Sequence, residues 1–63
     1  MNNLSYKFLI GQTVYIKPIS QIGRVTSVKF NGTFIEYNVE YWFEGNLRES
    51  YINEEDLQKQ WKN

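Results

Sequence analysis

The side chains that could take part in chemistry are few, because the sequence contains no His, no Cys and one Asp. Zinc sites built from Cys and His are therefore excluded, and so is any disulfide. General acid–base catalysis would need a carboxylate, a Lys or a Tyr with a shifted pKa, and the sequence offers no partner geometry for one. No Gly-rich phosphate-binding loop is present either. We expect a protein that is not an enzyme and holds no cofactor.

The acidic residues form two groups, and neither predicts a metal site. Glu36, Glu40 and Glu44 are spaced by four, but their apolar neighbours alternate, which favours the solvent face of a strand over a helical stripe. Residues 54–56 (Glu-Glu-Asp) supply oxygen ligands without the spacing of a calcium loop. A helix that begins with Asn53 as its cap accounts for these residues, because acidic side chains are favourable in the first turn.

The charge is uneven along the chain, although the net charge is zero. Residues 1–30 hold four cations and no acid, whereas residues 31–63 hold three cations and seven acids. This division fits a bipolar surface that steers a partner. It also fits cross-strand pairing of a basic and an acidic segment within one sheet, which we favour.

Four cations could line one side of the domain and bind nucleic acid. Tyr15 or Trp42 would serve as a stacking platform for bases. Four cations are few, and the neutral net charge and a pI near 6.2 indicate weak binding at most. The residues of this alternative interface are Lys17, Arg24, Lys29 and Arg48.

Alternating apolar residues predict the strands that must position these groups. Thr13–Lys17 is a half-buried strand ended by Pro18, with a loop over 19–22. Residues 23–30 form a second strand, in which a bulge near Thr26-Ser27 brings Val25 and Val28 onto one face. Residues 33–43 form a long third strand, and residues 47–52 return as a fourth.

Two dipeptides predict the hairpins. Asn31-Gly32 indicates a tight turn, since both residues tolerate positive φ. With a two-residue loop at Gly45-Asn46, Ile52 faces Val39 and points inward, whereas a three-residue loop would put Tyr51 there. We prefer Ile52. A helical turn near residues 53–58 then returns Leu57 to the core, with Trp61 packing beyond it or pairing in a last short strand.

The length of 63 residues predicts one domain, residues 8–61, after a flexible N-terminus at residues 1–7. Eleven aromatic residues compensate for the small size, because each ring buries a large apolar area. The side chains on the inner face of the expected strands make up the predicted core: Val14, Ile16, Val25, Val28, Ile35, Tyr37, Val39, Tyr41, Ile52 and Leu57.

Three aromatic residues are candidates for binding a protein partner: Phe34, Trp42 and Tyr51. Phe34 and Trp42 fall on the otherwise polar face of the long strand, and exposed aromatics among charges match the composition of interface hot spots. Alternatively, these rings cover an open end of the barrel, or Trp61 and Leu47 pack against them. Edge strands at Thr13–Lys17 or Leu47–Ile52 would offer strand addition as another route.

The order of core and turn residues carries a family resemblance. Phe8-x-Ile10-Gly11-x-x-Val14 precedes Gly23-x-Val25 and Tyr37-x-Val39, and Ile52-x-Glu54-x-x-Leu57 follows. Over residues 8–57 this resembles the small SH3-like barrels, including KOW-like and Tudor-like modules and many short uncharacterised phage and prophage proteins. The resemblance implies an all-β fold of four to five antiparallel strands, with one short 3-10 or α turn near the C-terminus. It also implies binding of peptides, proteins or nucleic acid.

Other features set the expected cellular context. Asn, Ile, Lys, Tyr and Phe make up 27 residues and Ala is absent, as expected from an AT-rich bacterial or phage genome. No apolar run is long enough for a membrane helix, and the first residues do not form a signal peptide. We expect a cytoplasmic interaction module, monomeric or homodimeric, that binds a protein partner, with weak nucleic-acid binding as the alternative.

Overall fold

The computed structural model describes residues 6–59, which form five antiparallel strands and two 3-10 turns. The strands pair in the order β4-β3-β2-β1-β5. Within the described residues, helical structure is confined to the two turns, so the prediction of an all-β fold is confirmed. The elements are β1 (Thr13–Ile16), η1 (Lys17–Ile19), β2 (Gln21–Asn31), β3 (Phe34–Phe43), β4 (Asn46–Asn53), η2 (Glu54–Asp56) and β5 (Leu57–Lys59).

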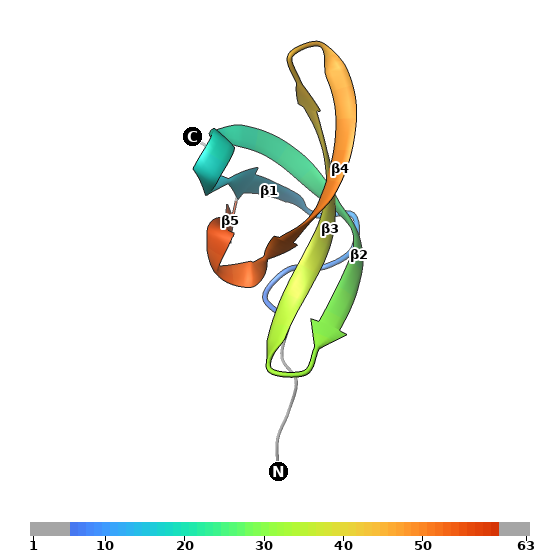
Figure 1. Cartoon of the computed structure of the whole chain (residues 1–63), viewed down its shortest axis with the longest axis vertical. Coiled ribbons are helices and arrows are strands. Elements are labelled where there is room, and N and C mark those ends of the chain that lie inside the picture. Colours follow the sequence, from blue (N-terminus) through green and yellow to red (C-terminus); the bar gives the residue numbers. More distant parts are fainter. Residues whose placement is uncertain (1–5, 60–63) are drawn as a thin grey trace.

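The sheet curls in the manner of a small barrel but does not close. β2 and β3 are long bent strands, and the tip of the β3–β4 hairpin projects beyond the rest of the molecule (Figure 1). β4 and β5 lie at the two ends of the strand order. The expectation of an edge strand at Thr13–Lys17 is therefore wrong: β1 pairs with β2 on one side and with β5 on the other.

The connection between the first two strands is shorter than the sequence predicts. β1 ends at Ile16 because η1 follows at once, with Pro18 in its first turn, where a missing N–H is tolerated. β2 begins at Gln21 instead of Gly23, so most of the expected loop at residues 19–22 belongs to η1 or β2. Pairing of Ile16 with Gln21 closes this hairpin.

Two features bend β2. The register with β3 shifts between Val25 and Ser27, which confirms the predicted bulge and leaves Thr26 as the extra residue. The hydroxyl of Thr26 donates to the Asn38 carbonyl at 3.0 Å. At Gly23, a Cβ atom would lie 2.5 Å from Val39 Cγ1. The strands can approach this closely only because residue 23 lacks a side chain.

The first hairpin lies where Asn-Gly predicts it, with a different loop. Asn31 is the last residue of β2 and pairs with Phe34, so the two loop residues are Gly32 and Thr33. Gly32 has a φ of 66°, whereas Asn31 does not have positive φ. The Thr33 N–H donates to the Asn31 carbonyl at 2.7 Å, which closes a γ-turn centred on Gly32, and glycine adopts the required positive φ without steric cost.

The second hairpin corrects the expected register. Phe43 pairs with Asn46, so the loop is Glu44-Gly45, and both residues have positive φ as a type I′ turn requires. Ile52 consequently faces Tyr37 and not Val39, whose partner is Ser50. The expected and observed loops both contain two residues, so the side of the sheet is unchanged. Ile52 packs against the core, as predicted.

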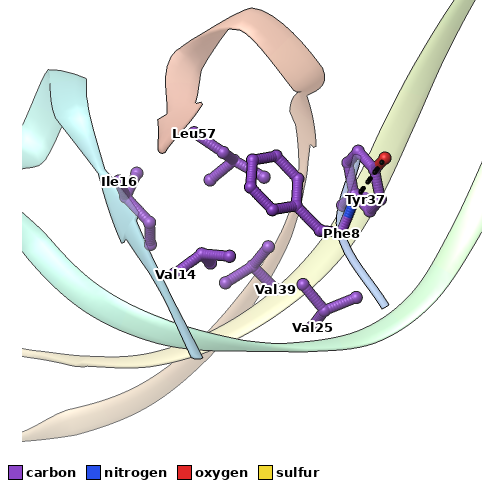
Figure 2. Close-up of a cluster of buried hydrophobic side chains, with 7 residues drawn as sticks. All are labelled: Phe8, Val14, Ile16, Val25, Tyr37, Val39 and Leu57. Carbon is purple, nitrogen blue, oxygen red and sulfur yellow. Dashed lines mark hydrogen bonds between the residues drawn. The ribbon is translucent and has the colours of Figure 1, made fainter. Parts of the chain in front are cut away.

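The core lies on the concave side of the sheet (Figure 2). Six predicted core residues are buried, and the other four are partly buried against them. Phe8 was not predicted as a core residue, yet it is 4% exposed and its ring packs edge-on against Tyr37 at 5.3 Å. The buried set is Phe8, Val14, Ile16, Val25, Tyr37, Val39 and Leu57, and Val28, Ile35, Tyr41 and Ile52 surround it.

The Tyr37 hydroxyl ties three segments together. It accepts hydrogen bonds from the backbone N–H groups of Lys7 and Phe8, at 3.0 and 3.3 Å, and donates to Glu54 Oε2 at 2.6 Å. Burial, followed by the hydrogen bond to the Glu54 carboxylate, raises the pKa of Tyr37 to about 12. One polar atom thus holds the N-terminal segment and η2 against β3.

The predicted helical turn is confirmed as η2, but Asn53 does not cap it. Asn53 occupies the N-cap position without a side-chain hydrogen bond to the turn. The Glu54 carboxylate of this turn instead accepts a hydrogen bond from the Tyr37 hydroxyl. Leu57 is buried, as predicted, and opens β5. The expectation for Trp61 falls outside the described residues.

Candidate protein-binding surface

The convex face of the sheet carries an apolar patch made by Ile22, Trp42 and Leu47. Trp42 and Leu47 pair directly across β3 and β4. Ile22 precedes Gly23, whose partner is Tyr41, so it reaches the same level of the sheet from β2. The three side chains line one shallow pocket of about 260 Å³. Three strands therefore contribute one apolar residue each to a continuous surface.

The patch is exposed because its residues alternate with the core. Tyr41 and Phe43 point to the concave side of β3, so Trp42 between them points outward. The exposed fractions are 64% for Trp42, 53% for Leu47 and 47% for Ile22. Leu47 lies beside the indole without covering it. Large exposed apolar side chains gathered in one place are a feature of interaction sites.

Charges of both signs border the apolar patch. Arg24 on β2 pairs directly with Glu40 on β3, and both residues line the same pocket as Trp42. A polar rim around an apolar centre is the usual anatomy of a protein–protein interface.

Phe34, the second predicted aromatic, lies far from the patch. It pairs with Asn31 beside the first hairpin loop and is 42% exposed. With Phe30 and Ile35 it lines a pocket of about 340 Å³ that also includes residues 53–55. Eight residues of extended strand, roughly 26 Å, separate it from Trp42.

Tyr51, the third predicted aromatic, already holds a cation from its own chain. It pairs with Asn38 near the middle of β4 and is 51% exposed. The Lys29 ammonium lies 4.9 Å from the centre of its ring. One face of the Tyr51 ring is therefore occupied by a cation–π contact. The structure does not bring Phe34, Trp42 and Tyr51 into one site.

The four predicted nucleic-acid-binding cations do not gather either. Arg24 and Lys29 share the convex face, but each pairs directly with an acid, Glu40 and Glu36 respectively. Arg48 faces the other side, with its guanidinium 5.7 Å from the Phe43 ring centre. Lys17 lies outside these strands, on the 3-10 turn η1. The basic and acidic halves of the sequence thus meet as cross-strand neighbours.

Sequence reasoning left two residues out of the apolar patch. Leu47 was considered only as a residue that could pack on Trp42, although its position two residues after the Glu44-Gly45 loop makes it the direct cross-strand partner of Trp42. Ile22 was assigned to a loop because Gly23 was read as the start of β2. Ile22 is β-branched, as Val25 is, and β-branched residues favour strands. This signal could have extended the predicted strand back to residue 22.

Comparison of the chain with family models, with curated proteins and with solved structures finds no match. Among residues 6–59, no helix is long and apolar enough to cross a membrane. The same residues contain no group of three or more acidic side chains arranged to hold a metal ion.

Proposed function

We propose that this chain is a non-enzymatic interaction module that binds a protein partner through the apolar patch of Ile22, Trp42 and Leu47. The observation that carries the proposal is the exposure of Trp42, which is 64% exposed between two other exposed apolar side chains. Trp is among the residues most enriched at interface hot spots. A partner that covers the patch would remove three large apolar side chains from water at once.

A binding role is preferred to catalysis on chemical grounds. The sequence has no His and no Cys. Tyr37 is a poor candidate for a general base, because a pKa of about 12 moves it away from neutral pH and its hydroxyl is already engaged with Glu54. The two acids of β3, Glu36 and Glu40, stand opposite the cations Lys29 and Arg24 of β2.

The fold and the origin belong to the same proposal. Five antiparallel strands with a 3-10 turn before the last strand are the arrangement implied by the resemblance to SH3-like barrels. Members of that group act mainly by binding, which supports an interaction module through analogy of fold. The frequent residues Asn, Ile, Lys, Tyr and Phe are those encoded by AT-rich codons, which supports a phage or prophage source. The absence of Cys suits the reducing cytoplasm.

The test compares two aromatic residues on one strand. Trp42→Ala should abolish capture of the partner from host lysate by the immobilised protein, because truncation of a central aromatic weakens binding by about 2 kcal/mol or more. Phe34→Ala, on the same strand but outside the patch, should retain capture. If both variants capture the partner as the wild type does, the patch is not the binding surface.

Salt dependence separates this proposal from nucleic-acid binding. Amide NMR spectra of the labelled protein would be recorded with short DNA and RNA at low and at physiological salt. We expect no shifts, because the four cations are dispersed and two of them, Arg24 and Lys29, are opposite acids. Shifts that gather on the cationic residues and fade as salt rises would favour a phosphate-driven complex over a protein partner. The amides to follow are those of Lys17, Arg24, Lys29 and Arg48.

A further inference from the structure

The free edge of β4 is the longest unpaired backbone in the sheet. Within residues 6–59, β4 pairs with β3 alone, whereas β1 is paired on both sides. β4 has eight residues and the other edge strand, β5, has three. Every second residue of an antiparallel strand directs its N–H and C=O away from its partner. The outer side of β4 therefore presents a row of backbone donors and acceptors.

A groove runs along this edge. The β3–β4 side of the groove is lined by Tyr41, Ser50 and Ile52. The opposite side is lined by Pro18 and Ile19 of η1. Its volume is about 260 Å³, which is below the usual range for small-molecule sites and suits one or two apolar side chains. The groove lies between η1 and the part of β4 over residues 50–53.

The convex side of the same edge has an unmatched negative charge. Glu40 and Glu49 pair directly across β3 and β4, an arrangement that is unfavourable for like charges. Arg24 is the cross-strand partner of Glu40 on its other side, whereas β4 is the last strand and no cation of residues 6–59 stands in register beyond Glu49. The Thr26 hydroxyl also lies 3.3 Å from Glu49 Oε2, but its single proton is shared with the nearer Asn38 carbonyl, and a neutral hydroxyl does not neutralise the carboxylate. The next position in this row, beyond Glu49, would belong to a strand added at the edge.

From these three observations we infer that β4 accepts an extended segment of a partner protein as a sixth strand. The segment pairs with the backbone of β4. Its alternate apolar side chains enter the groove beside Ile52 and Ile19, and a Lys or Arg between them faces Glu49. Backbone pairing supplies affinity in this mode of recognition, and the alternate side chains supply specificity. The site is separate from the apolar patch and does not depend on the role proposed for Trp42.

A second copy of this chain gains no charge pairing at the same edge. Residues that oppose each other in an antiparallel pair lie on the same face. Arg48 and Glu49 point to opposite faces of β4, so no antiparallel register of two β4 strands can set one against the other. Registers centred on either residue bring Arg48 to Arg48 or Glu49 to Glu49. The charge row therefore favours a different chain, with a cation, over self-association.

The test uses a synthetic strand as the probe. The isotope-labelled full chain is titrated with the capped heptapeptide Val-Thr-Val-Lys-Val-Thr-Val while amide NMR shifts are followed. A dissociation constant on the order of 1 mM is sufficient for detection. We expect shifts over residues 47–53 of wild type and of Trp42→Ala alike. The same peptide with Glu in place of Lys should bind about fivefold more weakly, as expected for a cross-strand charge pair.

Two controls decide the outcome. Glu49→Lys should reverse the preference between the Lys and Glu peptides, because the charge row is reversed. N-methyl groups on the central Lys and both neighbouring Val residues should abolish binding, since they remove backbone donors. Equal binding of the two peptides, or shifts that lie outside β4, would overturn the inference. Shifts of the β4 amides on concentrating the protein alone would also overturn it, because the occupant would then be a second copy.

Discussion

Tyr37 and Trp42 are two aromatic residues on one strand with opposite environments. Tyr37 is fully buried on the concave face, and its hydroxyl makes three hydrogen bonds. Trp42, five residues further along β3, is 64% exposed on the convex face beside Leu47 and Ile22. The difference follows from the period of two in a strand, which puts odd and even positions on opposite faces. One face of β3 therefore stabilises the fold, and the other is available for a partner.

The largest effect is expected at the closest contact of the concave face. In Gly23→Ala the added Cβ would lie 2.5 Å from Val39 Cγ1 and 2.9 Å from the Glu40 carbonyl oxygen. Val39 is fully buried and the carbonyl is backbone, so neither can move freely. We expect a loss of about 3 kcal/mol in the free energy of unfolding, measured by urea denaturation.

A matched control for this variant is Gly32→Ala in the first hairpin loop. Its Cβ would meet nothing within 4 Å, and only the positive φ of 66° opposes it. It should cost about 1 kcal/mol. If Gly23→Ala proves as mild as this control, β2 and β3 do not approach at Gly23 as closely as described.

The next effect tests the hydrogen bonds of Tyr37. Tyr37→Phe keeps the ring against Phe8 but removes the hydroxyl that, among residues 6–59, accepts from the buried Phe8 N–H. A buried donor left without a partner costs about 1 to 3 kcal/mol, and we expect about 2 kcal/mol in urea denaturation. Amide exchange at residues 7 and 8 should accelerate more than exchange in β3. Unchanged exchange at both residues would show that the N-terminal segment is held by packing alone.

These two regions differ in how far the sequence could predict them. Alternation along residues 33–43 places Tyr37 inside and Trp42 outside, and the broken alternation at Val25 and Val28 locates the bulge. These inferences need only the local period of the chain. The role of Phe8 was missed because its contact with Tyr37 joins residues 29 apart, and no local pattern reports such a contact.

The apolar patch was predicted only in part for a related reason. The register of β4 depends on which two residues form the loop, and Glu at a position of positive φ is an unexpected choice. Placing the loop at Gly45-Asn46 hides the direct partnership of Trp42 with Leu47, although it leaves Ile52 on the correct face. The face of a strand can thus be predicted from parity, whereas cross-strand neighbours require the exact turn.

Alkaline pH provides a third test of the concave face. The pKa of Tyr37 rises from 10.0 to about 12 in the folded protein, so the folded state holds the phenolic proton more tightly than the unfolded state. This contribution to stability is complete below pH 10 and is lost as the pH rises from 10 towards 12. Between pH 9 and 11 the loss should be about 1 kcal/mol.

The control for the pH effect is Tyr37→Phe, because it differs from the wild type only by the phenolic hydroxyl of residue 37. The difference in unfolding free energy between wild type and Tyr37→Phe should therefore shrink over this pH range. A constant difference would mean that Tyr37 ionises as readily in the folded protein as in the unfolded chain.

The smallest effect on stability is expected on the convex face. Trp42→Ala removes a side chain that is mostly in water and loses only the cross-strand contact with Leu47, which is worth about 0.5 kcal/mol. Urea denaturation should therefore separate Trp42→Ala clearly from the variants at Gly23 and Tyr37. A loss above about 3 kcal/mol is the range for truncating a buried ring, and it would show that Trp42 is covered within the chain. A small loss of stability together with abolished partner capture would assign Trp42 to binding, because the side chain would then stabilise the complex and not the isolated fold.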